Sequence, residues 1–254
     1  MLVFIVENHS LDQMRIGMPY TFGVAEEYGY ASNYYAVDHP SLPNYLAIAG
    51  GDTFGVRDDD GPSTHVLDDP SVFGRALAAG KTAAVYADGM PGNCAMENGG
   101  DDYAVRHNPW LYFAAEREQC AAHDKLVSDL DAAIREGALP NVGMVVPNTC
   151  HDAHNCSLTV ADDWFKQYLT RILDGPDWRS GHLAVVLTAD EDDHSQDNKV
   201  LTVVIHPSQR HHVVDTRLDH YSLARLYEDV AGVAHLGNAA SAASMSDAFG
   251  LPIP

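Results

Sequence analysis

The chain has 254 residues, of which 46% are hydrophobic. That content supports a large core, and the length fits one α/β domain over residues 1–254 better than two. Asp and Glu number 36 against 15 Lys and Arg, which gives a net charge of −21. Such a surface repels nucleic acid and anionic membranes, so neither is expected as a partner. A small phosphorylated molecule would also be repelled unless a bound cation supplies positive charge.

The four cysteines show neither a Cys-x-x-Cys pair nor the spacing of a zinc ribbon. Cys150 and Cys156 are close enough in sequence to staple one loop, and Cys94 and Cys120 could close a longer one. Two disulfides would imply an extracytoplasmic compartment, whereas four reduced thiols would fit a cytoplasmic enzyme. No segment is both long enough and continuously apolar enough to span a membrane. No signal peptide is visible either, so we expect a mature or trimmed form of the chain, or a cytoplasmic one.

Apolar runs alternate with amphipathic stretches along the chain. In chain order they predict strands at Leu2–Val6 and Tyr30–Val37, a short helix opening at Leu46–Ala49, a helix at Ser71–Ala79, a strand at Thr82–Ala87, a helix at Asp124–Arg135, a strand at Val142–Val146, a helix at Val160–Leu173, strands at Leu183–Thr188 and Val200–Ile205, and a helix at Tyr221–Ala231. Strands without strict alternation, separated by helices, are typical of a mostly parallel sheet with helices on both faces, a three-layer α/β sandwich.

Polar side chains follow four of these strands. In parallel sheets, ligands gather at the carboxyl ends of the strands, so these side chains are expected to meet. They are Glu7 and Asn8 after the first strand, Ser41 after the second, Asp152 and His154 after Val142–Val146, and Asp190 and Glu191 after Leu183–Thr188.

The segment Ser41-Leu42-Pro43 places a hydroxyl where a helix should begin. Serine is a good N-cap and proline favours the first helical turn, so a structural cap is one interpretation. The free N–H groups of a helix N-terminus also stabilise an anionic phosphate. Because metal-competent side chains follow the other strands, we interpret Ser41 as a nucleophile that also caps the helix.

Asp190 and Glu191 follow an apolar strand directly, and Glu7 could add a third carboxylate. Oxygen ligands of this kind suit hard or borderline divalent ions. The next two residues, Asp192 and Asp193, are interpreted as a solvated acidic loop.

Several histidines lie in polar clusters. Asp152 or His154 could bind a second metal ion or protonate a leaving oxygen, and His220 could join them. His107 fits a structural role and a functional one equally well, and the pair His211-His212 is expected on the surface. His9 and His39 receive no role.

With these residues the chain resembles the acid phosphatase and phospholipase C-type phosphoesterases, a branch of the alkaline phosphatase superfamily. The resemblance implies an α/β sandwich, with Ser41 as the nucleophile. It implies that Glu7, Asp190 and Glu191 hold a metal ion with the serine oxygen, and that Asn8 grips the phosphoryl group or the metal. It matches Asp152, His154 and His220 to a second metal site. The matching stretches are Glu7–Ser10, His39–Tyr45, Pro147-Asn148, Asp152–His154, Thr188–Glu191 and His220–Leu223.

The sequence therefore predicts a metal-dependent phosphomonoesterase that forms a phosphoserine at Ser41, which water activated near His154 or His220 then hydrolyses. One divalent ion is expected and a second is possible, with Zn²⁺, Mg²⁺, Mn²⁺ and Ca²⁺ all open. The alternatives are a phospholipase C-type phosphodiesterase, a phosphoryl transferase, and a non-catalytic ion-binding protein. Loops such as Gly51–Pro70 and Gly89–Asp102 are expected to choose the small phosphorylated substrate.

Overall fold

The computed structural model describes residues 1–253. Its main sheet has eight strands in the order β5-β4-β6-β1-β7-β8-β2-β9. Strand β8 is antiparallel to its neighbours β7 and β2, and the other pairs are parallel. The strands are β1 (Leu2–Val6), β2 (Gly29–Ala31), β4 (Ala83–Ala87), β5 (Asp124–Leu126), β6 (Val142–Val146), β7 (Val185–Ala189), β8 (Thr202–Ile205) and β9 (His212–Val214).

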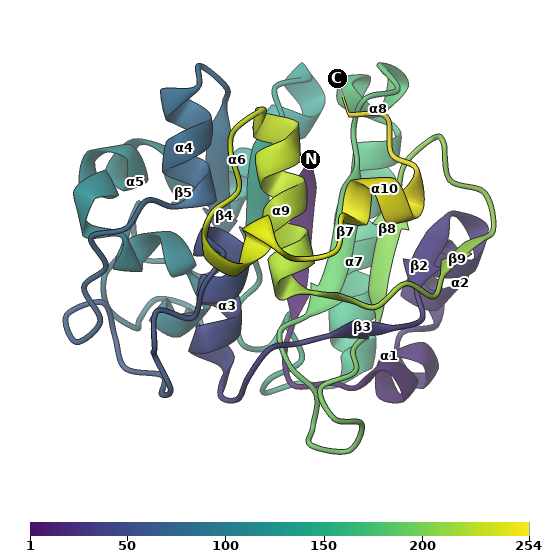
Figure 1. Cartoon of the computed structure of the whole chain (residues 1–254), viewed down its shortest axis with the longest axis horizontal. Helices are drawn as coiled ribbons and strands as arrows, with labels where there is room; N and C mark the ends of the chain where they lie inside the picture. Colours follow the sequence, from purple (N-terminus) through teal and green to yellow (C-terminus); the bar gives the residue numbers. More distant parts are fainter. Residues whose placement is uncertain (254) are drawn as a thin grey trace.

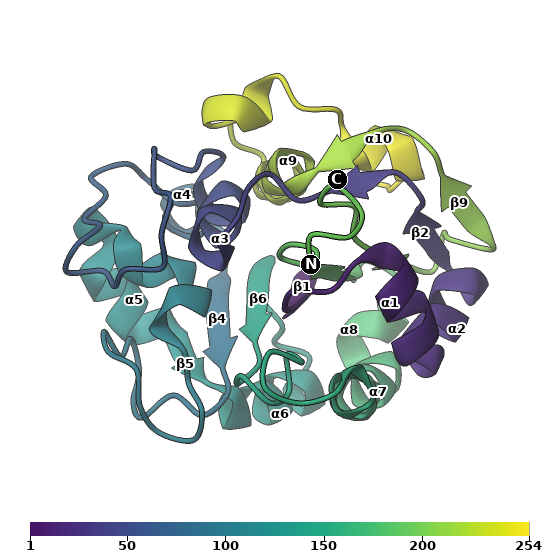
Figure 2. The same ribbon diagram turned by 90° about the horizontal axis from the view of Figure 1, so that it is seen from below.

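Helices cover both faces of this sheet, which confirms the predicted three-layer sandwich (Figures 1 and 2). One face carries α3 (Ser41–Gly50), α4 (Val72–Ala78), α9 (His220–Ala231) and α10 (Met245–Phe249). The other face carries α1 (Leu11–Gly17), α2 (Pro19–Glu27), α6 (Val127–Glu136), α7 (Leu158–Leu173) and α8 (Pro176–Arg179). Helix α5 (Arg117–His123) lies beside β5, and short 3-10 helices span Val105–His107, Pro109–Tyr112, Ala114–Glu116 and Gly237–Ala240.

Every residue of β1, β4, β6 and β7 is buried, which explains why these strands do not alternate between apolar and polar residues. Phe4 of β1 packs edge-on against Phe165 of α7, with the ring centroids 5.1 Å apart. Within residues 1–253, no helix is long and apolar enough to cross a membrane.

Two predicted elements prove to be composite. The expected strand Tyr30–Val37 is β2 followed by β3 (Tyr34–Tyr35), and β3 pairs with β10 (Leu218–Asp219) in a separate two-stranded sheet. The chain leaves the main sheet after Ala31, where Ser32 donates its N–H to Val214. The expected helix Asp124–Arg135 begins with the edge strand β5, and its helical part, α6, starts only at Val127.

Helix α3 begins at Ser41, as the segment Ser41-Leu42-Pro43 predicts, and it includes the short helix expected from Leu46. Its C-cap is Gly51, which adopts a left-handed conformation with φ of 70° that glycine tolerates without steric cost. This start places Ser41 at the edge of the sheet where the functional side chains gather.

Candidate active site

The strand register brings the first two predicted site segments together. Strands β1 and β7 are parallel with Val6 opposite Ala189, so Glu7 and Asp190 leave the sheet side by side at its carboxyl edge. This edge faces the viewer in Figure 2. Asn8 turns back with φ of 57° and donates its backbone N–H to Asp190 Oδ1 at 3.0 Å. Glu7 and Asp190 are both fully buried.

Ser41 meets this pair from the first turn of α3. Its Oγ donates to Glu7 Oε2 at 3.0 Å, and the residue is 4% exposed. The N-cap of α3 is Pro40, and the Ser41 side chain caps no helix N–H group. The prediction that Ser41 also caps the helix is therefore wrong. The Ser41 hydroxyl is directed at the carboxylates instead.

Helix α3 contributes two further residues that the sequence analysis missed. Tyr45, one turn after Ser41, donates its hydroxyl to Glu7 Oε1. Asn44 donates its side-chain N–H to Glu191 Oε2 at 3.3 Å. Its Oδ1 accepts the N–H groups of residues 37 and 38, which anchors the loop that leads to Ser41. The 3.6-residue helical period places these side chains beside the serine, but their types alone carry no signal.

His107 lies between two buried carboxylates and is itself 1% exposed. Its Nε2 is 3.3 Å from Glu7 Oε2, and its Nδ1 is 3.2 Å from Asp152 Oδ2. The ring stacks on Tyr45 with centroids 5.3 Å apart. Burial lowers the pKa of His107 well below its ordinary value, so the ring is neutral and carries one N–H. Both ring nitrogens are buried without a hydrogen-bond partner, which fits a role as a nitrogen ligand of a cation.

The carboxylates themselves point to the same conclusion. Burial, together with repulsion from Asp190 and Asp152, raises the pKa of Glu7 well above its ordinary value. Burial raises the pKa of Asp152 and of Asp190 to about 7 and that of Glu191 to about 9. Asp152 Oδ2 and Asp190 Oδ2 are buried without a hydrogen-bond partner. Acceptor atoms in this state fit a divalent metal ion, because the ion replaces the missing donors and offsets the repulsion.

The three residues matched to a second metal site do not converge. His154 is exposed, and its Nε2 lies 3.0 Å from a guanidinium nitrogen of Arg106. Its backbone N–H donates to Asp152 Oδ1 at 2.7 Å. His220 is buried at the start of α9, where its Nε2 donates to the backbone carbonyl of Asp190 at 2.6 Å. His220 Nδ1 is 3.1 Å from the Tyr34 hydroxyl, so both ring nitrogens already have partners.

The loop Gly51–Pro70 reaches the site through Asp59. Asp59 Oδ1 accepts the backbone N–H of Leu42, so this N–H of α3 is engaged within the protein. Asp59 Oδ2 lies 3.8 Å from Arg106 Nε. Arg106, next to His107 in the chain, thus sets a cation beside the carboxylates, and the sequence analysis did not identify it.

The acidic run after Glu191 divides into two parts. Asp193 belongs to a solvent-exposed loop as predicted, but Asp192 is only 1% exposed, so its interpretation as a solvated residue is wrong. Its carboxylate accepts the backbone N–H groups of His194 at 2.8 Å and Gln196 at 2.6 Å. Asp192 therefore forms an Asx-type turn, because its side chain accepts the backbone N–H groups of the second and fourth residues after it. The polar sequence Asp192–Gln196 is compatible with such a turn.

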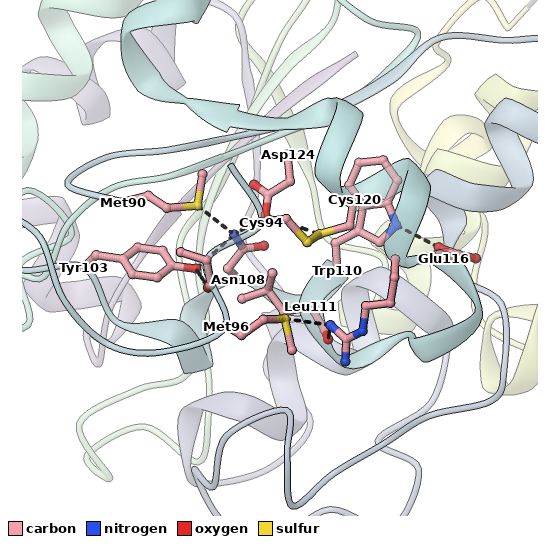
Figure 3. Close-up of a disulfide and its surroundings, with 12 residues drawn as sticks. Met90, Cys94, Met96, Tyr103, Asn108, Trp110, Leu111, Glu116, Cys120 and Asp124 are labelled. Carbon is pink, nitrogen blue, oxygen red and sulfur yellow. Dashed lines mark hydrogen bonds between the residues drawn. A yellow bond between two sulfur atoms is a disulfide. The ribbon is translucent and has the colours of Figure 1, made fainter. Parts of the chain in front are cut away.

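Both predicted disulfides are present, between Cys94 and Cys120 and between Cys150 and Cys156. The second closes the loop that carries Asp152 and His154. Figure 3 shows the first beside Asn108, the residue that follows His107 in the chain. There Asn108 donates its side-chain N–H to Asp124 Oδ2 at 2.9 Å, and Asp124 is buried beside Cys120. The two covalent links therefore brace two segments that supply site residues.

The fold indicates the class of protein. The structure superimposes on a protein of the alkaline phosphatase superfamily from Vibrio parahaemolyticus with a TM-score of 0.59 and 12% identity, over 91% of this chain and 66% of that one. At this identity the likeness concerns the fold, which is that of the alkaline phosphatase superfamily.

Sequence comparison then gives the family. The chain belongs to the phosphoesterase family, whose sequence model matches residues 13–234. It is thus a phosphoric ester hydrolase, and the resemblance is confirmed. It is 27% identical to the phosphatidylinositol-3-phosphatase of Mycobacterium tuberculosis, over 98% of this chain and 82% of that protein. It is 31% identical to a probable acid phosphatase of Kluyveromyces lactis over 81% of this chain, and spans about half (52%) of that relative.

Proposed function

We propose that this protein is a metal-dependent phosphomonoesterase that transfers a phosphoryl group first to Ser41 and then to water. The observation that carries the proposal is the Ser41 hydroxyl, which is held at 3.0 Å from Glu7 among buried carboxylates that lack donors. The relatives are named phosphatidylinositol-3-phosphatase and probable acid phosphatase, and because phosphatases cleave phosphate monoesters, these names support the monoester over the diester alternative.

Glu7, Asp190, Glu191 and Ser41 would hold the metal ion, with Asn8 beside them. When bound, the ion supplies positive charge that lowers the pKa of the serine hydroxyl and offsets the charge of the phosphoryl oxygens. These oxygen donors suit Mg²⁺, Mn²⁺ or Ca²⁺ as well as Zn²⁺. Asp152 and His107, which face each other at 3.2 Å, extend the donor set toward a second ion.

The protein groups then have separate tasks. Glu7 orients the Ser41 hydroxyl and receives its proton as the oxygen attacks phosphorus in line. The side-chain amide of Asn8 donates to a phosphoryl oxygen. His154 is exposed, and once its Nε2 exchanges the Arg106 contact for a proton it protonates the leaving oxygen. It later takes a proton from the attacking water, and Glu7 returns its proton to the Ser41 oxygen as the phosphoserine breaks. His220 keeps the Asp190 backbone in place through its 2.6 Å hydrogen bond and so positions the metal-binding carboxylates.

Arg106 completes the site as a fixed cation. A phosphate monoester carries one more negative charge than a diester near neutral pH, and the chain as a whole carries −21. The Arg106 guanidinium beside His154 reduces the repulsion that a monoester dianion meets at this edge. This placement favours a small phosphorylated substrate of monoester type.

The test is Ser41→Ala, compared with Ser32→Ala as a matched control. Ser32 is a half-buried serine that donates only to the Val214 carbonyl. With p-nitrophenyl phosphate and Mn²⁺, Ser41→Ala is expected to lower kcat by about 10³-fold or more, and Ser32→Ala to leave it unchanged. Acid quenching of the wild type during turnover should trap phosphate on Ser41. Wild-type turnover by Ser41→Ala would disprove the nucleophile, and no hydrolysis of monoester by the wild type would disprove the function.

We propose an extracytoplasmic location as well. Two disulfides with no free cysteine among residues 1–253 fit an oxidising compartment. Mass spectrometry of alkylated protein from the native source would test this, because cytoplasmic protein would carry four alkylated thiols.

A further inference from the structure

His39 occupies an unusual position between two acidic side chains. Its Nδ1 lies 3.0 Å from Glu191 Oε2, and its Nε2 lies 3.3 Å from Asp192 Oδ1. Glu191 is 5% exposed and Asp192 is 1% exposed, so both carboxylates are shielded from water. Neither His39 nor Asp192 takes part in the proposed reaction.

Both ring nitrogens of His39 therefore face a carboxylate oxygen, and Nδ1 is buried without a hydrogen-bond partner. An imidazole placed in this way can hold a second proton, or it can bind a metal ion through one nitrogen.

His194 favours the metal ion. Its ring lies beside that of His39, with centroids 4.0 Å apart. Ligand atoms of His39, Asp192 and His194 all lie within 4.8 Å of one another. Asp192 holds the backbone of His194, whose φ is 65°, at a position from which the ring lies against His39. A neighbouring imidazole adds nothing to an ion pair between a protonated His39 and its carboxylates, whereas a metal ion can be held by a carboxylate and two imidazoles together.

We propose that His39, Asp192 and His194 form a separate binding site for a borderline divalent ion of the Zn²⁺ and Co²⁺ class. Two imidazoles and one carboxylate are the ligands that such ions prefer, whereas Mg²⁺ and Ca²⁺ prefer oxygen. The site therefore favours ions of this class over Mg²⁺ more strongly than the oxygen-rich group around Ser41 does. It is also distinct from Asp152, His154 and His220, the residues matched to a second metal by resemblance.

Metal at Nε2 of His39 would fix the ring in one tautomer. The proton then resides on Nδ1 and is donated to Glu191 Oε2, giving a carboxylate–imidazole–metal arrangement. Asn44 donates to the same oxygen at 3.3 Å. The ion would thus orient Glu191 from outside the catalytic group. Binding itself does not rest on the proposed phosphatase activity.

The experiment titrates Co²⁺ into the full chain in excess Mg²⁺, which occupies the oxygen-rich group. Calorimetry counts bound ions, and visible absorption reports nitrogen coordination of Co²⁺. The variants are His194→Ala and Asp192→Asn, and the matched control is His211→Ala. His211 is also an exposed histidine with positive φ (49°), and its ring contacts only the Glu26 carbonyl.

The wild type, His211→Ala and Ser41→Ala are each expected to bind one Co²⁺ with the absorption of a nitrogen-coordinated ion. His194→Ala and Asp192→Asn should bind it at least about tenfold more weakly. Equal Co²⁺ affinity in the wild type and both site variants would overturn the proposal, as would an equal loss in His211→Ala. The result is independent of turnover, so it separates this site from a failure of the phosphatase proposal.

Discussion

Tyr45 offers a sharp test of how the site is built, because one oxygen atom can be removed there without changing the packing. Its hydroxyl donates to Glu7 Oε1, while Ser41 donates to the other oxygen of the same carboxylate. In Tyr45→Phe the ring can still stack on His107, but Glu7 loses one of the two donors that fix its direction. We expect weaker metal binding with the fold preserved.

The magnitude follows from the position of Tyr45 behind a proposed metal ligand. Loss of such a supporting hydrogen bond typically lowers metal affinity about 10- to 100-fold, or about 1.4–2.8 kcal/mol. A hydrogen bond to a charged group contributes about 1.5–3 kcal/mol, which agrees. Since Glu7 is fully buried, water cannot replace the missing donor, and the effect should lie in the upper part of this range.

Calorimetric titration with Mn²⁺ measures this effect, and Tyr227→Phe is the matched control. Tyr227 is also fully buried, and its hydroxyl donates to the Gly143 carbonyl at 2.7 Å, away from the carboxylates. Both variants should lose stability in thermal melts, but only Tyr45→Phe should lose Mn²⁺ affinity. Equal Mn²⁺ affinities in Tyr45→Phe and the wild type would refute the reasoning that Glu7 is a ligand oriented by Tyr45.

Three further outcomes are expected. The metal-free protein should become less stable from about pH 4 to about pH 7, because burial raises the pKa of Asp190 from 3.8 to about 7 and the folded state then retains a proton that the unfolded chain releases. Mn²⁺ affinity should rise over the same interval, and melts with and without Mn²⁺ check both. Replacing both cysteines of a pair by serine should lower the free energy of unfolding by about 3.5 kcal/mol for Cys94–Cys120 and by about 2.2 kcal/mol for Cys150–Cys156, whose sequence separations are 26 and 6. The second replacement should weaken Mn²⁺ binding more than the first, because its loop carries Asp152; urea unfolding and titration that reverse either order would contradict this. Arg106→Gln should lower kcat/KM for a monoester about tenfold more than for a diester, and a uniform loss on both esters would exclude a role in monoester selection.

The layered fold could be predicted from sequence because its central strands report their burial directly. A strand such as Leu2–Val6 is apolar at every position, and this pattern requires cover on both faces. The edges were less readable. Strand β5 (Asp124–Leu126) has three residues and merges with the following helix, so helical periodicity obscured it. Strand β3 pairs with β10, which lies about 180 residues later in the chain, and such pairing leaves no local pattern.

The site was predictable where its residues follow strands. Glu7 and Asp190 both stand directly after central strands, and the register of β1 and β7 places them together. Asn44 and Tyr45 could not be predicted as site residues, because only tertiary contacts bring them to Glu191 and Glu7. His220 was also predicted, but it lies at the start of helix α9 rather than after a central strand. Its ring donates a hydrogen bond to the Asp190 backbone carbonyl.

His107 and His39 show most clearly what the sequence could not supply. The sequence gives one of them even weight and the other no role, yet His107 lies between Glu7 and Asp152, and His39 lies between the consecutive residues Glu191 and Asp192. A histidine in a sequence is compatible with many environments, and these contacts arise only when segments distant in the chain meet. It is therefore the tertiary structure that makes these two histidines candidate cation ligands, which no local pattern in the sequence could do.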